Sequence, residues 1–317
     1  MTAPSAVAAA RPVSTPAERR AAELGVLVVM VLWAGNFIVV KGAIAVLPPV
    51  AFTFLRYALA ALTLLLLLRW REGRMGLPRR EILPIAVLGT IGFAIYQILW
   101  TAGLQSISAG DSALLIATTP VMTALIAAAI GADVLTPARL GGALLSFAGV
   151  ALVIAGGPGL ALSASLLGDV LTLLAAACWA IYTSFGVPIL RRHSPLRTTA
   201  WSVTFGAIAL APLGLFQLAE VAPVPVDAAI VLAILYSATL AAGVANVVVF
   251  HGVKLLGPTR ITAMQFLVPA IAVVLAAVIL HEPIRLAQIV GGAVILAGVA
   301  IARTDRVPAR VRAILRA

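Results

Sequence analysis

The sequence predicts a polytopic α-helical membrane protein, on three observations. First, 62% of its 317 residues are apolar, 10% are charged, and the mean hydropathy is +1.13. Second, apolar runs of about 20 residues recur along the whole chain, and each can cross a hydrocarbon core about 30 Å thick. Third, the basic residues gather in alternate gaps between these runs. Ten transmembrane helices are expected, at residues 22–42, 49–69, 80–104, 109–130, 137–157, 166–190, 197–218, 227–253, 259–280 and 285–303.

The net charge of +11 would suggest nucleic-acid binding in a soluble chain. However, with a cytoplasmic N-terminus, 19 of the 22 Lys and Arg residues fall in inner segments. The exceptions are Lys41 and Arg285 in outer loops and Arg56 within the membrane. This is the positive-inside distribution, so nucleic acid is excluded as a partner. The same distribution predicts that both termini are cytoplasmic. Because the Arg and Ala content is typical of GC-rich bacteria, we expect a bacterial inner-membrane protein.

An internal repeat is visible when the chain is compared with itself. A shift of 149 residues, or slightly less, aligns Trp33 with Trp179, Pro120 with Pro269, Asp133 with Glu282 and Gly142 with Gly291. We expect a disordered cytoplasmic tail at 1–21, a first repeat at 22–157, an outer linker at 158–165, a second repeat at 166–303 and a basic cytoplasmic tail at 304–317. Five helices is an odd number, so the two five-helix repeats lie inverted in the membrane. Inverted repeats are typical of transporters that work by alternating access around a site between the repeats.

Polar and aromatic residues concentrate on six expected helices, at 22–42, 80–104, 109–130, 166–190, 227–253 and 259–280. Polar groups within hydrocarbon need water or a protein partner, so we expect these residues to line a central cavity. The candidates are Trp33, Asn36, Phe37, Tyr96, Gln97, Trp100, Thr119, Trp179, Tyr182, Thr183, Asn246, Phe250 and Gln265. The alternative is that the aromatic residues anchor helix ends at the membrane interface and the amides join neighbouring helices. The other four helices are more uniformly apolar or Gly-rich and are expected to face lipid.

Further residues are candidates for movement or charge transfer. Pro120 and Pro269 are expected to be matching bends or gating points, or simple kinks. A proton or charge role is open to His251, Asp111, Lys41 and Arg56, although Asp111 could instead cap a helix and Lys41 could anchor at the interface. Gly142 with Gly149, and Gly291 with Gly298, are seven residues apart and share a helix face, which predicts helix packing.

Nothing in the sequence indicates an enzyme, a metal site or a cofactor. The single cysteine, Cys178, excludes an intrachain disulfide and a cysteine metal cluster. His193, His251 and His281 lack metal-ligand spacing, and there is no Gly-flanked Ser nucleophile. A membrane-embedded enzyme and a nonselective channel are the alternatives to a transporter.

Two motifs resemble signatures of the EamA family of the drug/metabolite transporter superfamily. The first is Trp33-x2-Asn36-Phe37-x3-Lys41 with Pro49 and Arg56, and the second is Glu282-Pro283-x4-Gln288-x2-Gly291 followed by residues 295–299. The resemblance covers essentially the whole chain, which within the family is most similar to bacterial exporters of aromatic amino acids and metabolites. The resemblance implies a ten-helix basket whose cavity is lined by the six helices above.

We therefore expect an exporter of aromatic or other neutral amino acids and related metabolites, either facilitative or loosely coupled. The alternative is a proton-coupled exporter of drugs or other small metabolites, with His251 or Asp111 as the titrating group. The expected partners are a small neutral or zwitterionic substrate and the lipid bilayer. A monomer is expected, with a dimer as the alternative.

Overall fold

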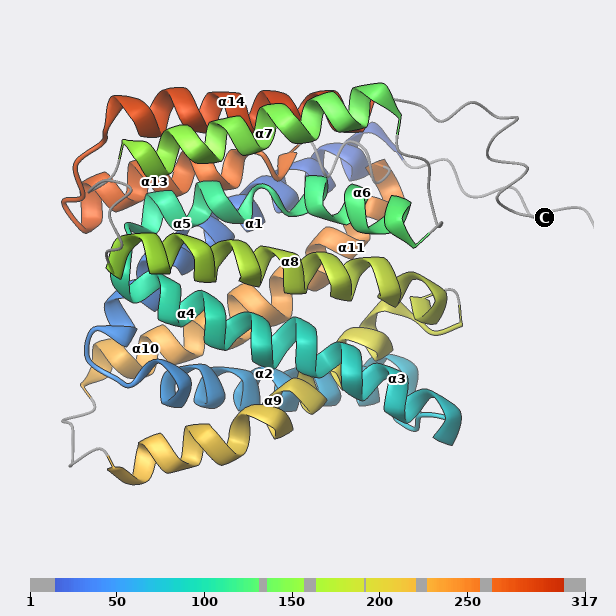
Figure 1. The fold of residues 1–317 in the computed structure, drawn as a ribbon. Coiled ribbons are helices and arrows are strands. Elements are labelled where there is room, and N and C mark those ends of the chain that lie inside the picture. Colours follow the sequence, from blue (N-terminus) through green and yellow to red (C-terminus); the bar gives the residue numbers. More distant parts are fainter. Residues whose placement is uncertain are drawn as a thin grey trace, which may run out of the picture.

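The computed structural model describes residues 15–130, 136–156, 164–190, 192–220, 227–256 and 264–304, and every regular element in these ranges is helical (Figure 1). The predicted tails, the linker around 158–163 and Asp133 lie largely or wholly outside these ranges. In chain order the elements are α1 (Pro16–Ile44), α2 (Pro49–Glu72), α3 (Arg79–Gly89), η1 (Thr90–Ile95), α4 (Tyr96–Ser106), α5 (Ala109–Ile116), α6 (Thr119–Ala129), α7 (Pro137–Ala155), α8 (Ala164–Leu190), α9 (Pro195–Glu220), α10 (Ala228–Leu235), η2 (Tyr236–Val244), α11 (Ala245–Leu256), α13 (Leu267–Ile279) and α14 (Leu286–Thr304).

Seven helical segments within the described ranges have the length and apolar composition needed to cross a membrane. They coincide with the first seven predicted helices and run from Pro16–Ile44 to Pro195–Glu220. Shorter apolar helices occupy Ala228–Val244, Leu267–Ile279 and Leu286–Ala302, within the last three predicted ranges. The chain is therefore a multi-pass membrane protein.

α1 begins at Pro16, six residues before the predicted start, because a capping box forms there. The Thr15 hydroxyl accepts from the Glu18 N–H at 3.2 Å, and the Glu18 carboxylate accepts from the Thr15 N–H at 2.7 Å. These two bonds satisfy backbone donors that a helix start leaves unpaired. Residues 16–21, expected to be disordered, are helical for this reason.

Two of the expected helices contain π-helical segments. η1 joins α3 to α4, and η2 joins α10 to α11, so that each set forms one continuous helical rod. A π-helical turn shifts the backbone hydrogen bonds and frequently marks a functional position. In η2 the Ala241 carbonyl accepts a hydrogen bond from the Trp33 indole N–H at 2.9 Å.

The expected helix 109–130 is interrupted at Ala117–Thr118, where α5 gives way to α6. Thr118 donates its hydroxyl to the Leu115 carbonyl at 2.6 Å, which helps satisfy the end of α5. Pro120 then lies in the first turn of α6, and Pro269 likewise lies in the first turn of α13. Each proline closely follows a break in its expected helix, at Ala117–Thr118 and at residues 265–266, and the first turn of the new helix tolerates a residue without an N–H. Their role as gating points stays a prediction.

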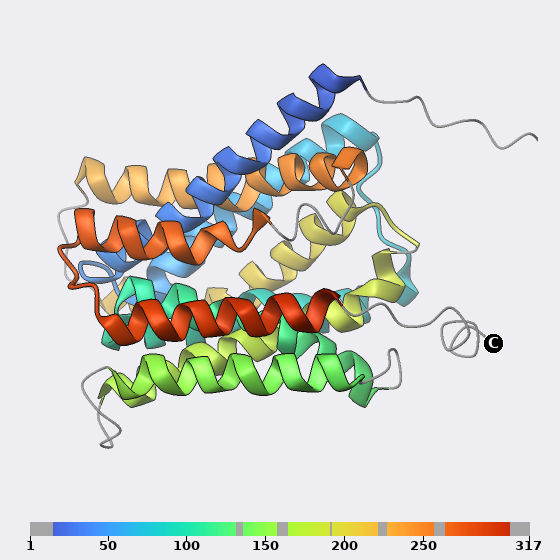
Figure 2. The same ribbon diagram turned by 90° about the horizontal axis from the view of Figure 1, so that it is seen from above.

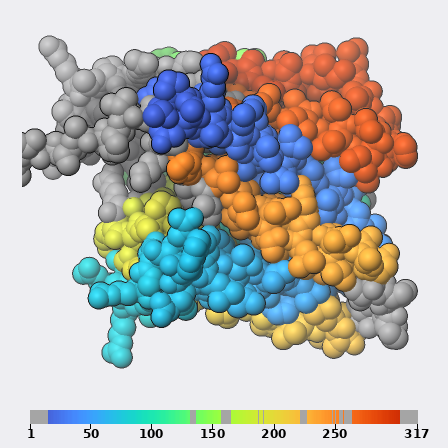
Figure 3. Space-filling model, turned by 180° about the vertical axis from the view of Figure 1, so that it is seen from behind, coloured from blue at the N-terminus to red at the C-terminus, as the bar shows by residue number. Residues whose placement is uncertain are grey.

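The helices form paired layers. α7 packs along α14 at one side of the molecule, α2 packs along α9 at the opposite side, and the other helices lie between these pairs (Figures 1 and 2). On the reverse face, α1 runs beside α11, with the red α14 on one side and the cyan α3 on the other (Figure 3). Large apolar side chains of the outer pairs are exposed, including Leu66 (61%) and Leu144 (63%). These helices suit contact with lipid, as predicted.

The α7–α14 contact depends on the glycines that were predicted to pack helices. A Cβ atom on Gly149 would lie 2.6 Å from the Gly291 carbonyl oxygen, and one on Gly142 would lie 2.5 Å from that of Gly298. Both distances are too short for a real Cβ contact, so only glycine allows the two backbones to approach this closely. The prediction that these residues pack helices is confirmed.

Replacing Gly149 by Ala should lower the free energy of unfolding by about 1–3 kcal/mol, because the added methyl group must push two backbones apart. Gly141→Ala is the matched control on the same helix, since a Cβ there would meet nothing within 4 Å. Thermal unfolding of both variants in detergent measures the difference. Equal unfolding temperatures for the two variants would contradict close packing at Gly149.

Candidate functional site

Seven aromatic side chains from α1, α2, η1, α4 and α8 form one continuous cluster inside the bundle. Neighbouring ring centroids in this aromatic cluster are 5.1–6.3 Å apart, the range of favourable ring contacts. Tyr96 stacks on Trp100 with an interplanar angle of 7°, and Trp179 lies 5.5 Å from Tyr96. The members are Phe37, Tyr57, Phe93, Tyr96, Trp100, Trp179 and Tyr182.

Polar groups hold the cluster in place. The Trp100 indole N–H donates to the Ser112 hydroxyl at 3.0 Å, which joins α4 to α5. Gln97 donates its side-chain N–H to the Tyr57 hydroxyl at 2.7 Å, which joins α4 to α2. Gln97 is 3% exposed, and its buried carbonyl oxygen has no hydrogen-bond partner among the described residues. The side-chain oxygen of Gln97 is therefore an unused hydrogen-bond acceptor beside the cluster.

Arg56 lies against this cluster and is 3% exposed. Its guanidinium carbon is 4.7 Å from the centroid of the Tyr57 ring and 5.8 Å from that of the Trp100 ring. One guanidinium N–H donates to the Ser237 hydroxyl at 3.0 Å, and Ser237 donates to the Asn36 side-chain oxygen at 2.5 Å. This chain of bonds connects α2, η2 and α1 at the centre of the bundle.

A second polar group, the Lys41 cluster, occupies the end of the bundle where α1, α4 and α13 finish. The Lys41 ammonium lies 3.0 Å from the Glu282 carboxylate and also donates to the Ile107 carbonyl. Both Glu282 carboxylate oxygens accept from the Ala109 N–H, at 3.0 and 3.1 Å. A carboxylate is stabilised at a helix N-terminus, so Glu282 binds α1 and α5 at once. The cluster consists of Lys41, Ser108, Asp111, Glu282, Arg285 and Gln288.

Asp111 is the centre of the other half of this cluster and is 7% exposed. Its carboxylate forms an ion pair with Arg285 and accepts from the Gln288 side chain at 2.9 Å. Arg285 also donates to the Gly156 carbonyl at 2.9 Å. The Lys41 cluster thus joins residues of the first half of the chain to residues of the second half.

Ion pairs also join the two halves at the opposite end of the bundle. The Glu81 carboxylate is 2.9 Å from Arg192, and that of Glu72 is 3.0 Å from Arg197. Glu81 is 1% exposed, so it depends on cations supplied by the connection between α8 and α9. These pairs hold α2 and α3 against α8 and α9.

The structure brings six of the predicted cavity residues into the aromatic cluster or its polar supports. Phe37, Tyr96, Trp100, Trp179 and Tyr182 belong to the cluster, and Gln97 supports it. Asn36 is connected to it through Ser237 and Arg56. All of these residues face the interior between the two outer helix pairs.

The other predicted cavity residues lie elsewhere. Trp33 packs against α11, Thr183 contacts the Thr123 hydroxyl at 3.3 Å, and Thr119 bonds the carbonyl of Ile116. These contacts do not test whether the three side chains line a cavity, so that role stays a prediction. Asn246 donates to the carbonyl of Ala242 in its own helix, Gln265 lies half-buried before α13, and the side chain of Phe250 lies outside the described part of the structure.

Among the charge candidates, Lys41 and Asp111 belong to the Lys41 cluster, Arg56 lies at the aromatic cluster, and His251 is exposed on α11. Sequence reasoning did not select Tyr57, Phe93, Ser112, Asp169, Ser237, Glu282, Arg285 or Gln288 as site residues. Glu282 and Gln288 stood in the closing motif, which was the available signal for them. Asp169, 5% exposed in α8, lies within range of electrostatic interaction with Asp111 and Arg285.

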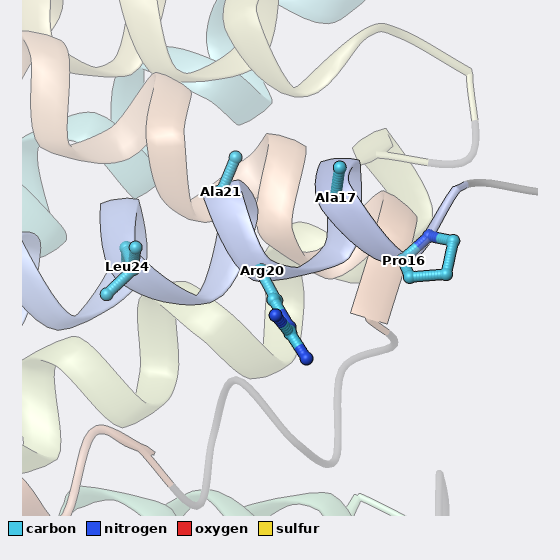
Figure 4. A pocket seen from close by; sticks show the side chains of 5 residues that line it. All are labelled: Pro16, Ala17, Arg20, Ala21 and Leu24. Carbon is cyan, nitrogen blue, oxygen red and sulfur yellow. The ribbon is translucent and has the colours of Figure 1, made fainter.

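A hollow of about 600 Å³ lies over the first turns of α1 (Figure 4). Its lining is Pro16, Ala17, Arg20, Ala21 and Leu24, all from this one helix. Leu24 is 64% exposed, so the hollow is an open surface feature. It is remote from the aromatic cluster and offers no converging polar groups, which ligand sites need.

The profile of the EamA-like transporter family matches residues 20–155 and again residues 166–304. The chain belongs to the EamA-like transporter family. This confirms the resemblance inferred from the two motifs. The aromatic cluster and the Lys41 cluster each contain residues from both matched regions.

Several relatives carry transporter names. An uncharacterised transporter of Archaeoglobus fulgidus is 30% identical over 85% of this chain and 93% of its own length. A probable terminal-alkyne amino-acid exporter of Streptantibioticus cattleyicolor is 31% identical over 70% of this chain and 73% of its length. A probable amino-acid metabolite efflux pump of Salmonella typhimurium is 28% identical over 87% and 92% of the two chains. A crystal structure with 19% identity and a TM-score of 0.64 covers 90% of this chain and 98% of that one, so the two share a fold.

Replacing Glu282 by Gln should lower the free energy of unfolding by about 1–3 kcal/mol. The substitution leaves Lys41 without its carboxylate and weakens the bonds from the N-terminus of α5, and the partial exposure of the pair limits the effect. Glu220→Gln, at an exposed site on α9, is the control. Thermal unfolding in detergent is the measurement, and unfolding of Glu282→Gln at the control temperature would contradict the proposed contribution of the ion pair.

Proposed function

We propose that this protein exports small neutral or zwitterionic metabolites, foremost aromatic and other neutral amino acids, from the bacterial cytoplasm. The observation that carries the proposal is the aromatic cluster, which combines broad apolar ring faces with an unused amide acceptor and a buried cation. Rings of this kind bind apolar side chains and attract ammonium groups. The names of the exporter and the efflux pump among the relatives support the same substrate class.

We further propose that the chain is built as two inverted repeats of five transmembrane helices. Contacts that mirror one another support this arrangement. The contact of α4 with α8 has its counterpart in that of α11 with α1, and the contact of α6 with α8 in that of α13 with α1. The outer pairs α7–α14 and α2–α9 each join equivalent helices. The two π-helical segments, and the two helices with a proline in the first turn, α6 and α13, also recur at matching positions.

The charge pattern supports a cytoplasmic location of both termini and of the Glu81 end. Basic residues are abundant there, whereas Lys41 and Arg285 are the cations of the opposite end. The Lys41 cluster would then be the outer closure of the transport path. Alternating access requires its inter-half bonds to break when the substrate leaves, because they join α1 and α5 to the connection between α13 and α14.

The decisive test is transport by purified protein in liposomes loaded with single amino acids. Saturable efflux of phenylalanine, tryptophan, methionine or threonine without a pH gradient is expected for a facilitative exporter. Efflux that requires a pH gradient would instead indicate proton coupling, and would make Asp111 and His251 the next targets. Unaltered retention of every amino acid would refute the amino-acid proposal and favour drugs or other metabolites.

The aromatic cluster makes its own prediction in this assay. Trp179→Ala should slow efflux of phenylalanine roughly 3- to 10-fold, because Trp179 contacts Phe93, Tyr96 and Tyr182 at the centre of the cluster. Trp70→Ala is the control, since Trp70 is 75% exposed at the end of α2. Each rate is normalised to the amount of monodisperse protein incorporated. Equal rates for the two variants would separate the cluster from the transport path.

A further inference from the structure

Arg56 is the membrane-embedded cation for which the described structure provides no acid. The two cations of the outer end are paired, Lys41 with Glu282 and Arg285 with Asp111. Arg56 has instead one bond to the Ser237 hydroxyl, and its buried Nε has no hydrogen-bond partner among the described residues. At 3% exposure, the Arg56 side chain is shielded from bulk solvent.

This arrangement is costly for a purely structural residue. A guanidinium stays protonated in proteins, so Arg56 cannot reduce the cost by losing its proton. Taking a charge out of water without a counter-charge is strongly unfavourable. A cation retained under such conditions indicates an anionic partner that is absent from the protein itself.

Joining helices at this depth does not require a cation. α2 begins at Pro49 and its equivalent helix α9 begins at Pro195. When the two helices are aligned at these prolines, Ser202 occupies the position in α9 that Arg56 occupies in α2. Ser202 is 1% exposed, so a small hydroxyl fills the equivalent interior position of α9. The cation therefore distinguishes one half of the molecule from the other.

The surroundings of Arg56 fit one kind of ligand. The Tyr57 ring contacts the guanidinium on its face, and its hydroxyl accepts from Gln97, so one tyrosine joins the cation to the unused amide oxygen. Trp100 lies 5.8 Å from the guanidinium and carries the stacked ring of Tyr96. A carboxylate on Arg56, an ammonium group on the Gln97 oxygen and an apolar group on the rings would use all three features.

We propose that Arg56 binds the carboxylate of the ligand, which makes this interior site specific for organic carboxylates that carry an apolar or aromatic group. A planar guanidinium can form two parallel hydrogen bonds to a carboxylate, which gives both strength and orientation. The inference names the substrate chemistry of the proposed exporter and, in that respect, rests on the proposed function. The binding chemistry is nevertheless testable without transport.

The test measures binding of 3-phenylpropionate and of its neutral amide, 3-phenylpropanamide, to the purified full-length protein by isothermal titration calorimetry. The unaltered protein should bind the acid roughly 10-fold or more tightly than the amide, because the amide lacks the charge. Arg56→Gln should lose this preference and bind both compounds alike. Absence of saturable acid binding, equal affinity for the two probes, or a full preference retained by Arg56→Gln would each overturn the proposal.

Two further variants guard against misfolding and general charge effects. Arg56→Lys keeps the positive charge and should keep a reduced preference for the acid. If Arg56→Gln fails to give monodisperse material, the comparison of Arg56→Lys with the unaltered protein takes its place. Arg74→Gln removes a cation at an exposed site near the cytoplasmic end and should leave the preference unchanged. Loss of the preference in Arg74→Gln as well would attribute it to net charge and overturn the proposal.

The same variants separate this inference from the proposed function. Acid preference that depends on Arg56, without efflux of any amino acid from liposomes, would refute amino-acid export and leave the carboxylate site standing. Efflux of phenylalanine at an equal rate by Arg56→Gln and the unaltered protein, without acid preference, would refute the carboxylate site and leave amino-acid export standing.

Discussion

A polar group buried inside a membrane protein must find its partner within that protein, because the surrounding hydrocarbon offers none. Many polar groups of this transporter follow this constraint. Glu282 pairs with Lys41, Asp111 pairs with Arg285, and the Trp100 indole N–H donates to the Ser112 hydroxyl. Each bond joins a helix to another helix or to the connection between α13 and α14, so the same bonds that satisfy the polar groups also assemble the bundle. Arg56 stands apart, since its neighbours in the described structure supply a hydroxyl and ring faces but no carboxylate.

The constraint divides the helices into two kinds. α7 and α14 associate through glycine faces in close backbone contact, with a bond from the Ser146 hydroxyl to the Ile295 carbonyl at 3.1 Å, and their large apolar side chains remain exposed. The helices between the outer pairs carry most of the rings of the aromatic cluster, and α2 adds Tyr57 and Arg56 from its inward face. A polar, aromatic interior flanked by apolar outer pairs is the arrangement a transporter needs, because the substrate must find partners inside while lipid meets an apolar surface.

Residue spacing predicted which side chains are neighbours wherever one helix determines the geometry. Tyr96 and Trp100 are one turn apart, so they had to share a face, and their rings are stacked. Spacing failed where a neighbouring helix decides. Trp33 is one turn from Phe37, yet its indole N–H donates to the Ala241 carbonyl in η2, and it packs against α11. The sequence analysis did not predict the π-helical segments, whereas the break at Ala117–Thr118 stands directly before the selected Pro120.

The sequence by itself determined the membrane character, the family and the helix faces that pack through glycine, because hydrophobic length, charge distribution and helical period are local properties of the chain. Which distant side chains meet was decided only by the tertiary structure. The pairing of Lys41 with Glu282 and the isolation of Arg56 from any described acid arise between residues up to 241 positions apart in the chain. A sequence shows that a charge enters the membrane, but its cost and its partner depend on the three-dimensional neighbours that replace water around it.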